Sequence, residues 1–351
     1  MSTKAPSLKP PSLKPLSQQV VVVVGASSGI GRASALRLAR RGAKLVVAAR
    51  SEPGLVSLVE EIKGKGGDAT YVVCDVADVE QVAKVADTAI WAYGRIDTWV
   101  NAAAVSIYAR FEDTTPAEFK RISEVNYLGQ VHGALAALPH LRHTGQGAII
   151  AISSVEAIVS LPLHSAYSAS KHAVEGAMDT LRRDLMAEGV PISVTSVKPG
   201  TINTPFFNNA RNKMDVKPQG PPPIYQPGVV ADCVVYAAEH PVRDLFAGGS
   251  GRMMAISQFL NPERTDRTLA KIGIPSERTS EPAPGGSPGT LDEPRLDDNR
   301  VQGDFSAKAR RFSLYTFLET HPRARRVASA SVLVTAPVLL ARIRRGQSVK
   351  V

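Results

Sequence analysis

The sequence predicts a doubly wound α/β fold, in which helices cover both faces of one parallel sheet. Short β-branched and apolar runs alternate along the chain with longer segments of helical periodicity. Strands that alternate with helices are joined by right-handed crossovers, which make the sheet parallel. Nearly continuous apolar runs, such as the five valines at 20–24, are typical of strands buried on both faces. A glycine-rich turn directly after this run is the third observation.

The alternation of strands and helices extends from Gln19 to about Leu260. Residues 19–260 are therefore interpreted as one domain. The expected strands are 20–24, 45–49, 70–73, 98–100, 148–152 and 192–197. The clearest helical patterns lie at 32–40, 79–93, 116–138 and 166–187.

Composition changes on both sides of this domain. Residues 1–18 contain PSLKP twice in tandem, so we expect a flexible, solvated Pro/Lys/Ser tail. Residues 261–312 lose apolar periodicity and include an acidic stretch rich in proline and glycine, which indicates a linker or a surface arm. Residues 313–351 regain apolar residues among arginines and are treated as a separate basic and apolar segment.

The net charge of +10 belongs to the two ends of the chain. Residues 1–18 carry +3 and residues 321–351 carry +7, so the span 19–320 is neutral. A nucleic-acid-binding domain is expected to carry its own basic patch. We therefore expect no nucleic-acid partner.

The cysteine content indicates a reducing compartment. Cys74 and Cys233 cannot form a disulfide framework, and they lack metal-ligand spacing, so we expect no metal site. The lysine-rich start of the chain has no apolar run behind it and does not resemble a secretory signal. We expect a cytoplasmic protein.

A glycine-rich turn follows the first expected strand and opens into a helix. Glycine lets the backbone approach a pyrophosphate, because no Cβ intrudes, and the helix presents free N–H groups to the anion. Between a buried strand and a helix, this arrangement indicates a Rossmann-like dinucleotide site. The expected contacts in the turn are Gly25, Ser27, Ser28, Gly29, Ile30 and Gly31.

The end of the second expected strand bears on the choice between NAD and NADP. An acid there would bind the adenosine ribose and repel a 2′-phosphate, but this chain has Ala49 followed by Arg50. The forked guanidinium of Arg50 suits a phosphate, although the residue could also be a solvated arginine. We favour the phosphate contact and hence NADP(H) over NAD(H).

Tyr167 and Lys171 lie four residues apart and share one face of an expected helix. A phenol with a pKa of about 10 is a poor base at neutral pH, and a nearby ammonium lowers that pKa. Ser154 follows the strand at 148–152, at the edge where doubly wound sheets bind ligands. A tyrosine and lysine at this spacing are common by chance, but the serine and the glycine turn make chance a poor explanation.

With these motifs the sequence resembles the short-chain dehydrogenases/reductases, in the branch with the Gly-x-x-x-Gly-x-Gly turn. The resemblance runs from residue 19 to 204 and more loosely to 260. It implies that Tyr167 is the acid or base at the reacting oxygen and that Ser154 hydrogen-bonds that oxygen. It also implies that Lys171 lowers the tyrosine pKa and that Asn126 holds a proton-relay water. The further cofactor contacts that it implies are Asp75, Val76, Asn101, Tyr167, Lys171, Pro199, Gly200, Ile202 and Thr204.

Two positions depart from the family pattern. Ala104 stands where the family usually has a glycine after its fourth strand, and Val24 replaces a threonine before the first glycine of the turn. Both changes affect the fine geometry of cofactor binding. Neither removes a catalytic group.

We therefore expect an NADP-dependent oxidoreductase that interconverts a secondary alcohol and a ketone or aldehyde. The loop that follows Thr204 is rich in proline and carries Phe206, Phe207, Met214, Ile224 and Tyr225, and the resemblance implies that it is a substrate lid. Its aromatic residues favour an apolar small-molecule substrate, although these side chains could equally cover the core. Glu156 and His164 lie between the serine and the tyrosine and could reach the substrate or remain at the surface. The alternative is a non-catalytic nucleotide-binding scaffold or sensor, although such proteins typically lose the tyrosine or the lysine.

The apolar stretch 328–341 is flanked by arginines. It is shorter than the roughly 18 residues of a membrane-spanning helix, and Pro337 interrupts it. Peripheral contact with an anionic membrane is one interpretation. The other, which we favour slightly, is packing on the core or on a second subunit, and we expect a homo-oligomer.

Overall fold

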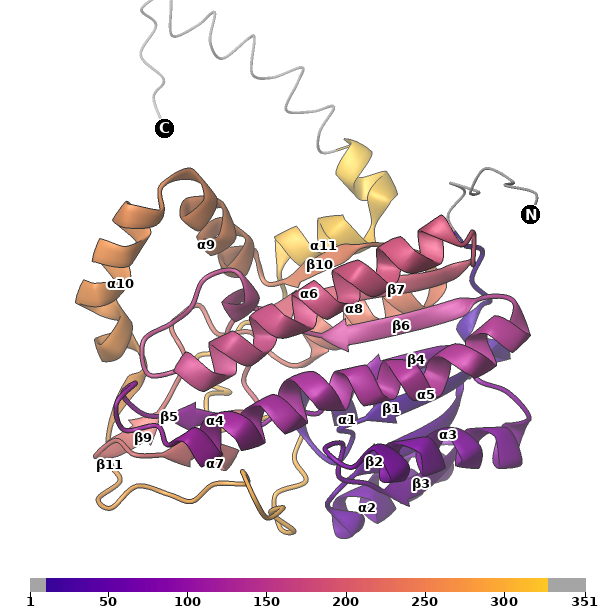
Figure 1. The fold of residues 1–351 in the computed structure, drawn as a ribbon, viewed down its shortest axis with the longest axis horizontal. Coiled ribbons are helices and arrows are strands. Elements are labelled where there is room, and N and C mark those ends of the chain that lie inside the picture. Colours follow the sequence, from indigo (N-terminus) through magenta and orange to yellow (C-terminus); the bar gives the residue numbers. More distant parts are fainter. Residues whose placement is uncertain (1–10, 328–351) are drawn as a thin grey trace, which may run out of the picture.

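The central feature of the computed structural model, which describes residues 11–327, is a seven-stranded parallel sheet (Figure 1). Its order is β10-β7-β6-β4-β1-β2-β3, with every neighbouring pair parallel. The strands are β1 (Val20–Val24), β2 (Lys44–Ala49), β3 (Asp68–Val73), β4 (Thr98–Asn101), β6 (Gly147–Ile152), β7 (Ile192–Pro199) and β10 (Asp244–Ala247). The predicted doubly wound fold is confirmed. The short edge strand β10 was not predicted.

Helices cover both faces of the sheet, and β1 shows how the two cores are divided. Val21 and Val23 pack with α1, α2 and α8, whereas Val22 and Val24 pack with α3, α5 and α6. Alternate side chains of a strand point to opposite faces, so an all-valine strand serves both cores. The helices are α1 (Gly29–Arg40), α2 (Glu52–Gly64), α3 (Val79–Tyr93), α4 (Pro116–Ser123), α5 (Gly129–Thr144), α6 (Ser165–Ala187), α7 (Phe206–Asn209) and α8 (Gly228–Glu239).

The helical pattern predicted over 116–138 is interrupted in the structure. Helices α4 and α5 are joined by one π-helical turn, η2 (Glu124–Leu128). π-turns inside helices occur frequently at functional sites. This one contains Asn126.

The chain after the sheet forms two helices and an extended arm. Helices α9 (Gly249–Leu260) and α10 (Pro262–Ser276) stand away from the sheet (Figure 1). Helix α10 lies where only a linker or surface arm was expected. Its start carries the usual signals, because the Asn261 side chain accepts the N–H of Arg264 and Pro262 is the first residue.

Residues 278–312, which we call the arm, begin with β11 (Arg278–Pro282), which pairs antiparallel with β9 (Val216–Pro218). The arm then runs along the lower edge of the view in gold and returns towards the sheet, before α11 (Leu314–Thr320) (Figure 1).

The start of the described chain does not behave as the solvated tail that was expected. Leu16 is buried in the core, and its backbone N–H donates to the Glu239 carboxylate at 3.1 Å. The Lys14 ammonium lies 3.1 Å from the carboxylate of Asp97, which also accepts the N–H of Val20. One apolar side chain and one buried carboxylate therefore fix residues 14–18 against the sheet.

The apolar stretch 328–341, for which membrane contact and packing were both considered, lies outside the described residues. Within residues 11–327, no helix has the length and apolar character needed to cross a membrane.

The turn between β1 and α1 depends on close backbone packing. A Cβ on Gly31 would lie 2.7 Å from the carbonyl carbon of Gly25 and would overlap its oxygen. We predict that Gly31→Ala lowers the free energy of unfolding by about 1–3 kcal/mol, because the turn must open. Urea unfolding measures this. Gly176→Ala is the control, since its Cβ meets nothing within 4 Å and alanine favours the α6 helix by up to about 1 kcal/mol. A Gly31→Ala protein as stable as the wild type would contradict the packing.

A second prediction concerns Glu277, at the junction of α10 and the arm. Its carboxyl group is fully buried, and neither oxygen has a hydrogen-bond partner among the described residues. Burial raises its pKa to about 8, against the opposing effect of His164, while Glu156 adds to the rise. A pKa higher in the folded than in the unfolded state means stability that is complete below about 4.5 and is lost as pH rises through about 8.

Glu277→Gln should therefore gain stability relative to the wild type as pH rises from 5 to 8. Urea unfolding at several pH values measures the difference. Glu263→Gln, at a side chain that is 82% exposed, should show no such trend. A stability difference for Glu277→Gln that does not change with pH would show that this carboxyl does not titrate in the range.

Candidate active site

One cavity, of about 260 Å³, follows the carboxyl ends of the central strands. One end is formed by the glycine turn and Arg50, and the other by Ser154, Tyr167 and Lys171. This is the edge of a doubly wound sheet at which ligands bind. The cavity is continuous between the two ends, as an extended dinucleotide requires.

Most of the predicted site residues line this cavity. They are Gly25, Ser27, Ser28, Gly29, Ile30, Gly31, Arg50, Asp75, Val76, Ser154, Tyr167, Lys171, Pro199, Gly200, Ile202 and Thr204. Asn101 and Asn126 do not line it. The Asn101 side chain instead accepts from the Trp99 indole N–H at 2.9 Å and donates to the carbonyl of Gln130 at 3.2 Å.

Asn126 lies in the π-turn and braces two parts of the site. Its amide exchanges hydrogen bonds of 2.8 and 2.9 Å with the backbone of Val105 and donates to the Ser170 hydroxyl at 3.1 Å. Its side chain thus links the segment after β4 to helix α6. The side-chain donors and the acceptor are already engaged within the protein.

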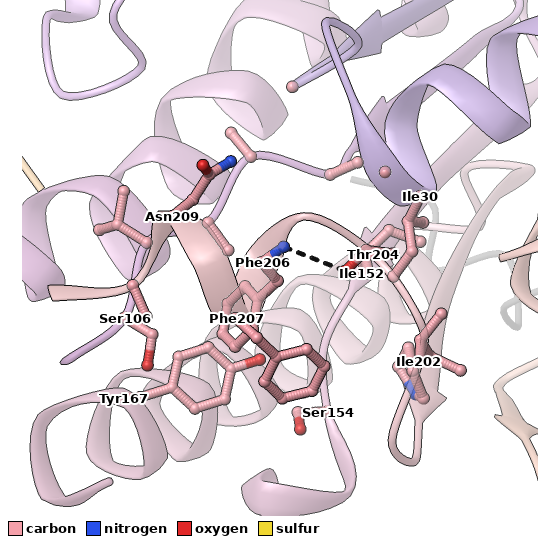
Figure 2. A pocket seen from close by; sticks show the side chains of 18 of the residues that line it. Ile30, Ser106, Ile152, Ser154, Tyr167, Ile202, Thr204, Phe206, Phe207 and Asn209 are labelled. Carbon is pink, nitrogen blue, oxygen red and sulfur yellow. Dashed lines mark hydrogen bonds between the residues drawn. The ribbon is translucent and has the colours of Figure 1, made fainter. Parts of the chain in front are cut away.

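Helix α6 carries Tyr167 and Lys171 into the cavity, facing Ser154. Figure 2 shows Tyr167, Ser154 and Phe206 gathered at this end, and the rings of Tyr167 and Phe206 are 5.5 Å apart between centroids. The Lys171 ammonium is buried, donates to the carbonyl of Ile152 at 2.9 Å and lies 5.5 Å from the Tyr167 ring centroid. An ammonium has three protons, so Lys171 retains donors for a ligand.

The electrostatics of this end differ from the expectation that Lys171 lowers the pKa of Tyr167. Burial, with Glu156, raises the pKa of Tyr167, and the hydrogen bond with Ser154 offsets this only in part. Burial also lowers the pKa of Lys171 to about 8, although Glu156 and Glu175 oppose it. Desolvation of the phenolate is thus the dominant influence on the pKa of Tyr167. Tyr167 is therefore protonated at neutral pH.

At the other end, Arg50 lies at the end of β2 as predicted, but its guanidinium is engaged. Its terminal nitrogens donate to the backbone carbonyls of Asp292 at 2.8 Å and Thr290 at 2.6 Å, both in the arm. Asp75 is paired with Arg121 at 2.6 Å. The arm is therefore part of the adenosine end of the cavity.

The substrate end is largely aromatic. Phe206 and Phe207 line it, with Tyr108, whereas the other lid residues considered, Met214, Ile224 and Tyr225, do not. The two phenylalanine rings are 5.8 Å apart between centroids. Helix α7 thus contributes two aromatic rings to this end of the cavity, and Phe207 also packs in a small core cluster with Tyr108.

Glu156 and His164 both line the cavity and form a buried pair. The His164 Nδ1 lies 2.9 Å from a Glu156 oxygen, and the Ser168 hydroxyl donates to the same carboxylate at 2.7 Å. Burial lowers the pKa of His164, but the Glu156 carboxylate outweighs it and the result is about 9. The pair is therefore an imidazolium held against a carboxylate.

Sequence reasoning missed the cavity residues that the arm contributes. These are Thr290, Pro294, Arg295 and Asp298. The composition of the arm indicated only irregular structure, and no motif in it points to the cavity. No three His, Cys, Asp or Glu side chains of residues 11–327 are grouped as a metal site would require.

Comparison with known proteins identifies the family. The sequence model described as short chain dehydrogenase matches residues 19–215. An uncharacterized oxidoreductase of Bacillus subtilis, YxnA, is 40% identical over 273 residues, which is 77% of each chain. Dehydrogenase/reductase SDR family member 7B of Mus musculus is 38% identical over 199 residues, covering 56% of this chain and 61% of the mouse protein.

Two solved structures share the fold. A short-chain dehydrogenase/reductase of Burkholderia phymatum in complex with NAD has a TM-score of 0.64 and 25% identity, over 71% of this chain and 96% of its own. An alcohol dehydrogenase of the archaeon Thermococcus sibiricus, complexed with 5-hydroxy-NADP, has a TM-score of 0.57 and 27% identity, over 65% and 95%. Because the family model spans more than half of the chain, the protein belongs to the short-chain dehydrogenase/reductase family of NAD(P)-dependent oxidoreductases.

Proposed function

We propose that the protein is an NADP-dependent oxidoreductase that interconverts a secondary alcohol and a ketone or aldehyde on an apolar small molecule. The observation that carries the proposal is the meeting of Ser154, Tyr167 and Lys171 in one cavity with the glycine turn. A scaffold protein has no need for a buried phenol and ammonium, which are costly to desolvate. The similarity to an alcohol dehydrogenase supports the same reaction class.

The nicotinamide, when bound, supplies or accepts the hydride. In the direction of reduction, Tyr167 donates its proton to the carbonyl oxygen, and its raised pKa keeps that proton in place beforehand. The hydroxyl of Ser154 donates a hydrogen bond to the same oxygen as negative charge develops. The Lys171 ammonium holds the ribose hydroxyls and stabilises the phenolate once the proton has left.

The preference for an apolar substrate is supported by the wall of the cavity beside Tyr167. Phe206, Phe207 and Leu161 present carbon to that end. Contact between such side chains and substrate is favoured by about 25 cal/mol for each Å² of apolar surface removed from water. Assay of ketones, aldehydes and sterols for NADPH consumption by the purified protein tests the function. Binding of dinucleotide without turnover of any of them would favour the scaffold alternative.

The preference for NADP is supported by the end of β2. Ala49 and Arg50 stand where an acid would repel a 2′-phosphate, and Arg50 supplies positive charge there even while its terminal nitrogens hold the arm.

We predict that Tyr167→Phe lowers kcat by about 10²–10⁴-fold, because it removes the proton donor and little volume. The Kd for NADPH should stay near the wild-type value. The kcat is measured from initial rates on a substrate found in the assay. The Kd for NADPH is measured by fluorescence titration. Tyr71→Phe, at a surface tyrosine that bonds Glu52, is the matched control and should leave kcat unchanged. Wild-type turnover by the Tyr167→Phe protein would disprove the role.

A second prediction is that Arg50→Asp lowers the ratio of NADP affinity to NAD affinity, because a repulsive charge replaces a cation near the 2′-position. The ratio of the two Kd values measures this change in preference. If the wild-type protein binds NAD as tightly as NADP, the cofactor preference is refuted.

A further inference from the structure

The arm passes along the whole cofactor side of the cavity. It contacts the adenosine end, the glycine turn and the segment after β7, in that order along the chain. Four of its residues line the cavity itself. Each attachment is made by specific hydrogen bonds or by burial, as the following contacts show.

At the adenosine end the arm is anchored by one apolar side chain and two arginines. Leu291 is 1% exposed and packs in the core cluster that contains α3 and α5. The Arg121 Nε donates to the carbonyl of Leu291 at 3.1 Å, and Arg50 holds the carbonyls on either side of it. Loss of these contacts would expose Leu291 and remove the two carbonyl acceptors of the Arg50 terminal nitrogens.

At the glycine turn the arm meets the backbone that is expected to face the pyrophosphate. The N–H of Gly29, the first residue of α1, donates to the carbonyl of Arg300 at 2.9 Å. Asn299 lies against Gly54 so closely that a Cβ there would come within 3.1 Å of its side-chain carbon. The arm thus covers the turn from outside and takes one of the free N–H groups at the helix start.

Beyond the turn the arm is tied to the segment that follows β7. The N–H of Gly303 donates to the backbone carbonyl of Asn203 at 3.1 Å. The N–H of Phe305 donates to the side-chain oxygen of Asn203 at 2.9 Å. A Cβ on Gly303 would lie 2.7 Å from the carbonyl carbon of Thr204. Residues 290–303, which we call the strap, therefore run across the cavity between the anchors at Leu291 and Gly303.

Arg295 lies in the middle of this stretch and lines the cavity. The arginine fork is well suited to bind phosphate. Arg50 already donates to two carbonyls. Arg300 is paired with Asp298 and Asp304 at 2.8 and 2.9 Å, so the charge of Asp298, which lines the cavity, is neutralised. The ion pair of Arg295, with Asp297, is 3.9 Å long. Its fork is therefore the least committed of these three.

We propose that residues 290–303 form the outer wall of the dinucleotide site and that Arg295 binds a phosphate group of the cofactor. This inference deepens the proposed function and depends on dinucleotide binding at the glycine turn. The strap closes over the ligand, so the dinucleotide enters and leaves when residues 290–303 lift from the cavity. Binding and exchange of both NAD and NADP are then governed in part by the arm.

Arg295→Ala tests the phosphate contact by equilibrium binding. The Kd values for NADPH and NADH are measured by fluorescence titration, with Arg267→Ala, at an 82% exposed side chain of α10, as the control. We expect affinity to fall by about tenfold or more, as for a lost hydrogen bond between charged groups. A loss for NADPH alone identifies the 2′-phosphate, and an equal loss for both identifies the pyrophosphate. Unchanged affinity for both refutes the role of Arg295.

Two measurements test the wall independently of turnover. NADPH should slow tryptic cleavage at Arg295 and Arg300 but not at Arg267, because the closed strap is held in place by the ligand. Gly303→Ala, which pushes the strap from Thr204, should speed NADPH dissociation in stopped-flow displacement, with Gly176→Ala as the control. If NADPH does not affect cleavage and Gly303→Ala does not change the rate of NADPH dissociation, residues 290–303 do not form the outer wall of the site.

The outcomes also separate this inference from the proposed function. If the wild-type protein binds neither dinucleotide, both proposals fail. If it binds them and the arm variants behave as the wild type does, only the inference about the arm fails. Melting temperatures of all variants show whether each protein is folded, and the Arg295 side chain is 38% exposed.

Discussion

The buried ammonium of Lys171 is the interaction on which the rest of the site depends. It lies where β6 ends, donates to the carbonyl of Ile152, and is carried by the helix that also carries Tyr167 one turn earlier. Removing an ammonium from water is costly, and the pKa of about 8 reflects that cost. Glu156 and Glu175 offset part of it without making direct salt bridges to Lys171. The sheet edge, the helix and the two carboxylates therefore all act on this one charge.

Much of the fold could be predicted because its elements have a strong local signal. The five valines of β1 predict a strand without any tertiary information. Helix α3 begins after a side-chain cap at Asp78 and ends at the left-handed Gly94. The edge strand β10 has only four residues and one neighbouring strand. Its pairing with β7 defines it as a strand, whereas its short sequence does not predict one. Helix α10 was missed because its apolar residues are few and its surroundings are rich in proline.

The site divides in the same way. The turn glycines, Ser154, Tyr167 and Lys171 were predictable because the chemistry restricts both residue type and spacing. The partners of Arg50 could not be predicted, because they are backbone carbonyls some 240 residues away. Every residue has a carbonyl, so the sequence does not indicate which one accepts. The rise in the pKa of Tyr167 could not be predicted for a related reason. Spacing shows that a lysine is near, whereas burial, which dominates the shift, is a property of the folded chain.

The distribution of protons in the cavity connects this electrostatic environment to the direction of the reaction. At neutral pH the phenol of Tyr167 keeps its proton, and the imidazolium of His164 neutralises Glu156 beside it. In the proposed reaction, reduction of a carbonyl would use a proton that is already in place. On the proposed function, oxidation of an alcohol would need the phenolate, which the burial of Tyr167 disfavours. An oxidised nicotinamide, when bound, would add a positive charge, and a cation close to a phenol lowers its pKa. The same side chains would therefore serve both directions of the proposed reaction, and a bound oxidised cofactor would favour formation of the base that oxidation needs.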